Sequence, residues 1–187
     1  MADRGRDRDR DRDRDAAYIK RYADQTRKRE NEHATWGHTF AEHVDATDVE
    51  LQRRAATGVN ARGHDEGFCP KNATRWKSDA ACVRATGALW SQPEAQKQRR
   101  EIDAKVQAGQ PVKQSIEVRG RLDQVLGPRW QNDVYGRSHS SGGRAASQWS
   151  ADSHAVAVFR RQPNGKWYVY TCYPNPDPLQ PVRMDQC

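Results

Sequence analysis

Residues 153–173, SHAVAVFRRQPNGKWYVYTCY, decide the fold class, because they place a turn signal between two strand-like runs. β-Branched and aromatic residues, which favour strands, are frequent in both runs. Between the runs, Asn164 and Gly165 form a dipeptide that favours tight hairpin turns, since both residues tolerate the positive φ angles that such turns require. The stretch therefore predicts an antiparallel β-hairpin near the C-terminal end of the chain.

Upstream of this hairpin, the sequence predicts helices before strands. Thr47 and Glu50 have the spacing of a capping box, which starts a helix, and Gly58 supplies its stop. A later run of alternating apolar residues predicts a strand broken at Gly120. Helices followed by strands indicate an α+β domain, in which N-terminal helices pack on an antiparallel sheet that ends in the C-terminal hairpin. The predicted helices cover residues 38–44, 47–57, 72–90 and 92–108, and the predicted strand covers residues 114–122.

The two ends of the chain differ in composition from its middle. Residues 1–15 alternate Arg with Asp and offer no apolar surface to bury, so we expect a disordered, solvated tail. Residues 16–34 can form a linker or docking helix. The folded domain is expected over residues 35–178, with a mobile Gly- and Ser-rich loop at residues 136–147. Residues 179–187 are expected to form an irregular C-terminal tail.

The charge of the chain points to a polyanionic partner. The 187 residues carry a formal net charge of +7, and the mean hydropathy is −1.13. The first fifteen residues contain six Arg and six Asp, so the whole positive surplus belongs to the rest of the chain. A basic body attracts nucleic acid through long-range electrostatics that do not depend on base sequence. Nucleic acid is therefore the first partner to consider.

The sequence also limits where the protein resides. It has no apolar run approaching the roughly 20 residues that span a bilayer, and its N-terminus lacks the apolar core of a signal peptide. Export, if it occurs, is therefore expected to use a non-classical route. The four cysteines, Cys69, Cys82, Cys172 and Cys187, contain no CxxC pair, which argues against a zinc ribbon. A bridge between Cys69 and Cys82 is left open.

The segment GHTFAEHVDATDVELQRR, residues 37–54, holds two histidines and ends in two arginines. His38, Glu42 and His43 resemble an inverted zinc-protease motif with one residue too many. Metal ligands on one helix face are separated by four residues, and a five-residue step would turn the second histidine away, so we expect no metal site.

Proton transfer is the other chemical interpretation of this segment. His43 titrates close to neutral pH, and Arg54 can bind phosphate oxygens in a bidentate manner. The alternative is purely structural, with Arg54 paired to Glu50 one helical turn earlier. In the hairpin, Thr171 and Tyr173 are two residues apart on a strand and project from the same face. Two adjacent hydroxyls of this kind can bind a phosphate or the edge of a base.

Together these features resemble the bacterial RNase A-like toxin domain, which is found at the C-terminal ends of contact-dependent growth-inhibition proteins and other polymorphic toxins. The resemblance rests on HTFAEHV, on Arg54 eleven residues after His43, and on the final Thr171-Cys172-Tyr173-Pro174. It implies an RNase A-like fold without that enzyme's disulfides. It also implies that the catalytic residues are His43, Arg54, Thr171 and Tyr173, with no metal and no cofactor.

The reaction implied by the resemblance is cleavage of RNA by its own ribose 2′-OH. His43 would accept the hydroxyl proton, and Arg54 would stabilise charge on the phosphoryl oxygens. Thr171 and Tyr173 would position the phosphate or a base. A second histidine that protonates the leaving oxygen is not assigned, and His38, His139 and His154 all stay open.

The resemblance also implies partners and a place of action. A potent ribonuclease requires a cognate immunity protein in its producer, and the toxin would act on RNA in the cytoplasm of the target cell. Two other functions stay open from the sequence. The protein could be an ADP-ribosyltransferase toxin, or a non-catalytic RNA-binding effector that uses aromatic residues as stacking platforms. The RNA that is cut, the delivery system and the oligomeric state are not predicted.

Overall fold

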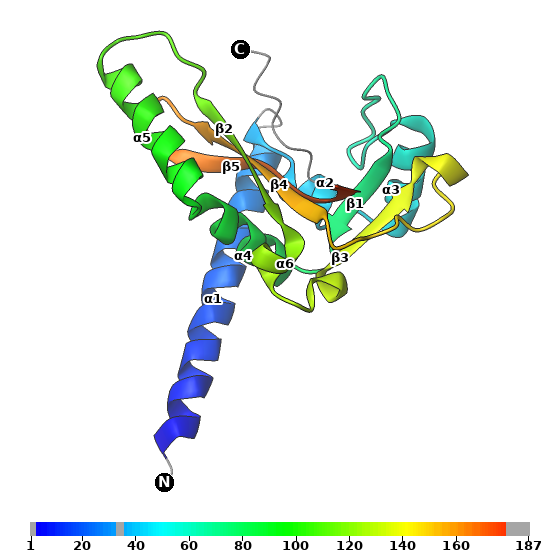
Figure 1. Cartoon of the computed structure of the whole chain (residues 1–187), viewed down its shortest axis with the longest axis horizontal. Coiled ribbons are helices and arrows are strands. Elements are labelled where there is room, and N and C mark those ends of the chain that lie inside the picture. The colour runs from blue at the N-terminus through cyan, green and yellow to red at the C-terminus, as the bar shows by residue number, and fades with distance from the viewer. Residues whose placement is uncertain (1–2, 33–35, 179–187) are drawn as a thin grey trace.

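The protein folds into helices and two antiparallel sheets, which confirms the α+β class (Figure 1). The computed structural model describes residues 3–32 and 36–178, and of residues 3–12 only the backbone. No helix within these ranges is long and apolar enough to cross a membrane. The main helices are α1 (Asp3–Glu32), α2 (Thr39–His43), α3 (Asp48–Thr57), α4 (Asp79–Trp90), α5 (Pro93–Gln107) and α6 (Leu122–Leu126), and the strands are β1 (Asn72–Trp76), β2 (Ser115–Arg121), β3 (Val134–Ser138), β4 (Ser153–Arg161) and β5 (Trp167–Pro178).

The predicted hairpin forms strands β4 and β5 of a three-stranded sheet in the order β2-β4-β5. Its turn is closed by backbone bonds between Gln162 and Lys166, and Gly165 takes a φ of 86°. Strand β5 continues to Pro178, so the proline-rich segment after Tyr173 is not irregular throughout. Prolines are tolerated there because β5 is an edge strand with one side unpaired. The predicted tail at residues 179–187 lies outside the described residues.

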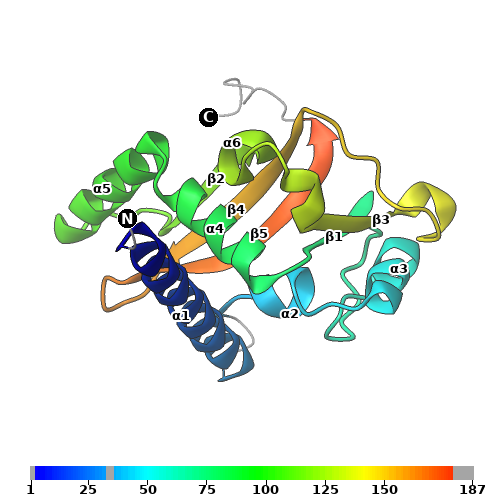
Figure 2. The same cartoon turned by 90° about the horizontal axis from the view of Figure 1, so that it is seen from below.

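The largest core lies between this sheet and α4, which crosses one face of it (Figure 2). Ser78 caps α4 by accepting a hydrogen bond from the backbone N–H of Ala81. The helix predicted for residues 72–90 is therefore wrong in its first part, which is strand β1. In that part, Thr74 and Trp76 are buried on a strand whose partner, β3, lies far away in the sequence.

Strand β2 confirms the strand predicted for residues 114–122, and it is not broken at Gly120. A Cβ atom at this glycine would lie 2.7–3.0 Å from side-chain atoms of Gln92, Val125 and Leu89, so the position requires glycine for close packing. Helix α5 confirms the helix predicted for residues 92–108.

The second sheet pairs β1 with β3 and was not predicted. It changes the interpretation of residues 136–147, which were expected to be a mobile loop. The first residues of that segment complete β3, and residues 139–141 form a short 3-10 helix, η3. Gly136 belongs to β3, and a Cβ atom there would lie 2.7 Å from the Ser147 hydroxyl. The glycine therefore serves close packing in a strand.

Helix α1 is continuous from Asp3 to Glu32, which differs from the disordered tail expected for residues 1–15. An alternating Arg-Asp repeat places opposite charges three residues apart, where they attract, and like charges four residues apart, where they repel, so the charge pattern alone does not explain this helix. The N-terminal part of α1 projects from the body (Figure 1). Its C-terminal part is buried against the domain, and Ala23 belongs to the main core. The folded domain therefore includes the C-terminal part of α1 and does not begin at residue 35, as was predicted.

The cysteines lie in separate environments. The Cys69 thiol donates to the Ala56 carbonyl at 3.4 Å, whereas Cys82 and Cys172 are fully buried in the main core. These three cysteines are free, so Cys69 and Cys82 are not bridged in this structure. Cys187 lies outside the described residues.

The outer edge of β5 brings several distant segments together. Backbone carbonyls along this edge each accept a hydrogen bond from another element, which also protects the edge from pairing with a further strand. The bonds are Arg29 Nη2 to Val169 O at 3.3 Å, His38 N to Tyr170 O at 3.0 Å, Trp76 Nε1 to Cys172 O at 3.0 Å and Thr74 Oγ1 to Pro174 O at 2.5 Å. The segment before α2 and strand β1 therefore meet at β5, next to Thr171 and Tyr173.

Candidate active site

Helix α2 ends at His43 and begins just after His38, and α1 holds this helix in place. The Glu30 carboxylate accepts hydrogen bonds from the backbone N–H groups of Phe40 and Ala41, at 3.1–3.2 Å. These are amides at the start of α2, which no intrahelical carbonyl can satisfy. Glu30 is only 2% exposed, and burial raises the pKa of its carboxyl. The position of α2 thus depends on a buried acceptor that sequence analysis did not identify.

His43, at the end of α2, is buried and held in a defined orientation. Its Nδ1 lies 3.1 Å from the backbone carbonyl of Thr74 on β1. A carbonyl oxygen only accepts, so we assign the ring proton to Nδ1, which leaves Nε2 with a lone pair. Burial lowers the pKa of His43 well below 6.5, and the charge of Arg54 lowers it further. The ring is therefore neutral at neutral pH and able to accept a proton or a hydrogen bond.

Tyr173 on β5 lies directly against this imidazole. The two rings are stacked, with centroids 5.1 Å apart and 30° between their planes. Burial raises the pKa of Tyr173, so its hydroxyl stays protonated and can donate a hydrogen bond. The structure therefore brings the predicted residues His43 and Tyr173 together, although 130 positions separate them in the sequence.

Thr171 lies on the same face of β5 as Tyr173, as predicted. In the sheet register, Thr171 is opposite Val158 and Tyr173 is opposite Val156, so both occupy alternate positions on the two strands. Thr171 is buried, and its hydroxyl has no hydrogen-bond partner among the described residues. Buried hydroxyls are usually satisfied, and the exceptions call for an explanation. A bound group that accepts or donates at this hydroxyl would supply one.

Arg54 lies beside the histidines, but its partners differ from those expected. Its guanidinium binds Glu66 through Nε and Nη2 at 3.1 and 2.8 Å, and Nη1 lies 3.4 Å from Glu42 Oε2. The expected alternative, a pair with Glu50, is wrong, because Glu50 forms the predicted capping box with Thr47. Two carboxylates therefore already hold Arg54 in place.

His38 lies next to His43, which corrects the prediction that a five-residue step separates the two rings. The centroids are 5.7 Å apart. The prediction assumed one continuous helix, whereas His38 precedes α2 as its N-cap, with φ −150° and ψ 22°. The His38 ring also packs edge-on against Tyr170, with centroids 5.1 Å apart. His38 is therefore part of the same site.

The proximity of His38, Glu42 and His43 raises the question of a metal, since one ligand atom from each lies within 4.8 Å of the others. The charges of the surrounding residues disfavour a cation. Glu42 already binds Asn60 at 3.1 Å as well as Arg54. Burial, followed by the charges of Arg54, Arg62 and Arg160, lowers the pKa of His38 to about 4. Positive charge that disfavours a proton on His38 also disfavours a metal cation and favours an anion.

The other two candidate histidines bind backbone carbonyls elsewhere in the fold. His139 Nδ1 lies 2.7 Å from the Ala55 carbonyl, beside α3. His154 Nδ1 lies 2.9 Å from the Asp177 carbonyl, and its buried Nε2 has no partner in the described part of the chain. Only His38 therefore joins the site by direct ring contact.

Residues that sequence analysis missed complete the site. Tyr170 and Arg160 form one such pair, because the Arg160 guanidinium carbon lies 3.4 Å above the Tyr170 ring. Two carboxylates were also missed: Glu66 positions Arg54, and Glu30 positions α2. Tyr170 could have been noticed, since it lies in the same strand as the predicted hydroxyls. The carbonyl of Thr74 carries no sequence signal, because any residue supplies one.

Comparisons with known proteins identified no relative of this chain. A scan of protein-family models, a search of curated proteins and a search of solved structures each found no match to this chain. The resemblance to the RNase A-like toxin domain therefore rests on short motifs and their order, and function must be argued from the site.

Proposed function

We propose that this protein is an RNase A-like interbacterial toxin that cleaves RNA without a metal ion. One observation carries the proposal. A neutral imidazole, His43, is oriented by a backbone carbonyl, has a lone pair on Nε2 and stacks on Tyr173. A general base for a ribose hydroxyl needs this protonation state at neutral pH.

In the proposed reaction, His43 Nε2 accepts the proton of a ribose 2′-OH, and O2′ attacks the adjacent phosphorus. The bond from phosphorus to O5′ breaks, which leaves a 2′,3′-cyclic phosphate on one fragment and a 5′-OH on the other. The leaving oxygen takes up a proton from water, and His43 returns its proton to water, so the protons balance. Thr171 and Tyr173 donate hydrogen bonds to the phosphate, a role that suits a hydroxyl without a partner and a phenol that stays protonated.

Arginine side chains around the site support phosphate as the bound group, because guanidinium groups bind phosphate oxygens. Arg54, Arg62 and Arg160 all act on His38, whereas Glu42 and Glu66 bind Arg54. With Glu30, which acts on Glu42, three carboxylates balance the formal charge of these three arginines. Because carboxylates already hold Arg54, we assign part of the charge stabilisation to Arg62 and Arg160, and we assign to Arg54 the added task of keeping His43 neutral.

The biological setting of the proposal comes from the motif resemblance. The toxin would reach a competing cell by a non-classical route, act on RNA in its cytoplasm and be blocked in the producer by an immunity protein. The basic body of the chain fits an RNA substrate.

The proposal is tested with an RNA oligonucleotide that carries a single 2′-deoxy substitution. We expect cleavage at every accessible linkage except the one after the substituted ribose, and fragments that end in 2′,3′-cyclic phosphate. His43→Ala should abolish cleavage. His64→Ala is the matched control, because in the described part of the chain His64 forms its hydrogen bonds to Asn60 through backbone atoms. RNA binding without any cleavage would instead favour a non-catalytic effector.

A further inference from the structure

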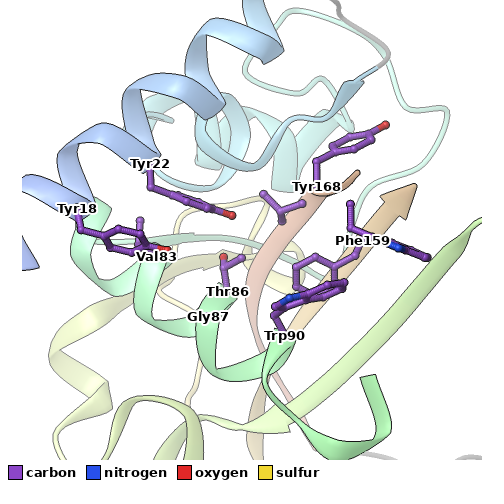
Figure 3. Close-up of a pocket in the computed structure, with 10 residues that line it drawn as sticks. Tyr18, Tyr22, Val83, Thr86, Gly87, Trp90, Phe159 and Tyr168 are labelled. Atoms are coloured by element: carbon purple, nitrogen blue, oxygen red, sulfur yellow. The ribbon is translucent and has the colours of Figure 1, made fainter. Parts of the chain in front are cut away.

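A cavity of about 260 Å³ opens between α1, α4 and the strands β4 and β5 (Figure 3). Tyr22 extends into this region from α1, and Trp90 from α4, while Tyr168 flanks it from β5. None of the lining residues belongs to the site around His43. The aromatic lining residues are Tyr18, Tyr22, Trp90, Phe159, Trp167 and Tyr168.

The walls of the cavity suit a flat aromatic ring. Trp90 packs against Phe159 with centroids 4.6 Å apart and against Trp167 with centroids 5.9 Å apart. Tyr22 and Tyr168 line the same space. Burial raises the pKa of Tyr22, so its phenol stays neutral. Planar ligands gain affinity by stacking on such rings, whatever the identity of the base.

Two arginines next to these rings add positive charge. The Arg29 guanidinium carbon lies 4.9 Å from the Tyr168 ring centroid, and that of Arg99 lies 5.9 Å from the Trp90 centroid. Neither arginine forms an ion pair with a carboxylate in the described part of the chain, and the Nε of each is buried without a partner. No acidic residue lines the cavity. An aromatic ligand that carries a negative charge therefore matches it better than a neutral aromatic side chain of a partner protein.

We infer that this aromatic pocket binds a nucleobase of the RNA strand, with the neighbouring phosphate attracted by Arg29 and Arg99. The inference rests on the proposed function and adds a subsite to it. The pocket and the candidate active site share strand β5. Tyr168, which lines the pocket, pairs in register with Arg160, whose guanidinium lies on Tyr170 of the site. About 16 Å of strand separates Tyr168 from Tyr173. In the register, Tyr168 lies on the same face of the sheet as Tyr173, whereas Phe159 and Val169 of the pocket lie on the opposite face, so an RNA strand that reaches both sites must pass around β5.

Gly87 allows the pocket to be blocked without disturbing the fold. It is an exposed residue of α4 that lines the pocket, and a Cβ atom added there would meet nothing within 4 Å. Leucine is also a better helix former than glycine. Gly87→Leu therefore fills the pocket. Gly87→Ala is the matched control, because it also replaces glycine with a better helix former but leaves the pocket open.

Binding is measured with a labelled single-stranded DNA pentanucleotide, which lacks the 2′-OH and is not cleaved. We expect Gly87→Leu to weaken its binding about tenfold, the worth of one stacked base, and Gly87→Ala to leave it unchanged. Circular dichroism and thermal melting check that both variants fold. Equal affinity of the leucine variant and the wild type would overturn the inference, and so would equal loss in both variants.

Cleavage kinetics separate this inference from the proposed function. A dinucleotide RNA is too short to span both sites, so Gly87→Leu should cleave it at the wild-type rate while KM rises for a longer RNA. If the wild type cleaves no RNA but Gly87→Leu still weakens binding of the DNA probe, the pocket stands and the ribonuclease proposal fails. If RNA is cleaved and the leucine variant behaves as wild type on both lengths, the ribonuclease stands and the pocket is not a base subsite.

Discussion

The imidazole of His43 lies 5.1 Å from the ring of Tyr173, stacked at 30°, although one residue belongs to a short N-terminal helix and the other to the last strand. This ring contact forms because both the segment before α2 and strand β1 donate hydrogen bonds to backbone carbonyls along the edge of β5. It makes the orientation of His43 depend on the strand that also carries Thr171. The predictions below separate the contributions of this ring contact, of the protonation states and of the supports around it.

Two substitutions at Tyr173 separate its ring from its hydroxyl. Tyr173→Phe keeps the stacked ring, so we expect unchanged stability and a loss of activity on the order of tenfold to a hundredfold, as for one lost hydrogen bond to the transition state. Tyr173→Leu also removes the aromatic contact, which should cost about a further 1 kcal/mol of stability. Urea unfolding and steady-state cleavage kinetics measure both effects. Equal activity of Tyr173→Phe and the wild type would exclude a role for the hydroxyl.

Stability should fall as the pH is lowered below about 6.5. Burial lowers the pKa of His38 to about 4, and that of His43 lies well below 6.5. Between these values and pH 6.5, the folded state binds fewer protons than the unfolded state. The contribution of the two neutral histidines to the free energy of unfolding is therefore complete above pH 6.5 and is lost progressively toward pH 4. His38 alone accounts for about 3 kcal/mol over this range.

The comparison variant for this prediction is His38→Asn, whose stability should depend less on pH between 6.5 and 4. Glu30 and Glu42 have raised pKa values, which change the stability in the opposite direction, but they do so in both proteins. The difference between the two curves of unfolding free energy against pH therefore gives the contribution of His38. Parallel pH curves for the two proteins would show that His38 is not kept neutral by its surroundings.

Gly37→Ala should damage both stability and activity. Gly37 has a φ of 125°, and a Cβ atom would lie 2.7 Å from the Tyr170 carbonyl, which also accepts the backbone bond of His38. The substitution strains the backbone and pushes His38 away from β5, at a cost of about 2–3 kcal/mol. Gly63→Ala is the control, since its φ is 80° but nothing lies within 4 Å. A similar loss in both variants would mean that backbone strain alone matters and that the contact with β5 does not.

Glu30→Ala should destabilise the protein by about 2–3 kcal/mol, because two buried amides at the start of α2 lose their acceptor. Activity should fall as well, since α2 carries His43. Glu32→Ala tests the same helix at an exposed position, where its 3.7 Å pair with Lys28 contributes less than about 0.5 kcal/mol. Chemical unfolding measures the free energy of unfolding of both variants. Equal values for Glu30→Ala and Glu32→Ala would show that α1 does not support α2.

The elements that were predicted correctly are those with local signals. Asn164-Gly165 specified the hairpin turn, and Thr47 with Glu50 specified the start of α3. Strand β1 was missed because Trp76 and Ala80 also fit a helical spacing, and the strand forms only by pairing with β3. The length of β5 was missed because prolines usually end strands, and only an edge position tolerates them.

The sequence predicted that His43, Thr171 and Tyr173 would lie together, but not the residues that hold them in place. His43 and Tyr173 meet as expected, and Thr171 shares the face of Tyr173. The partners of Arg54 were not predictable, because Glu66 reaches it through a loop whose path has no periodic signal. His38 was misplaced because its backbone is not helical, a feature that depends on its bond to Tyr170.

The central claim is tested most directly by incubating purified protein with RNA in excess chelator. We predict that the wild type degrades the RNA at the same rate with and without the chelator, and that His43→Ala, folded by circular dichroism, leaves it intact. Degradation that stops when divalent ions are removed, or that continues undiminished in His43→Ala, would contradict the proposal that the His43 imidazole is the base.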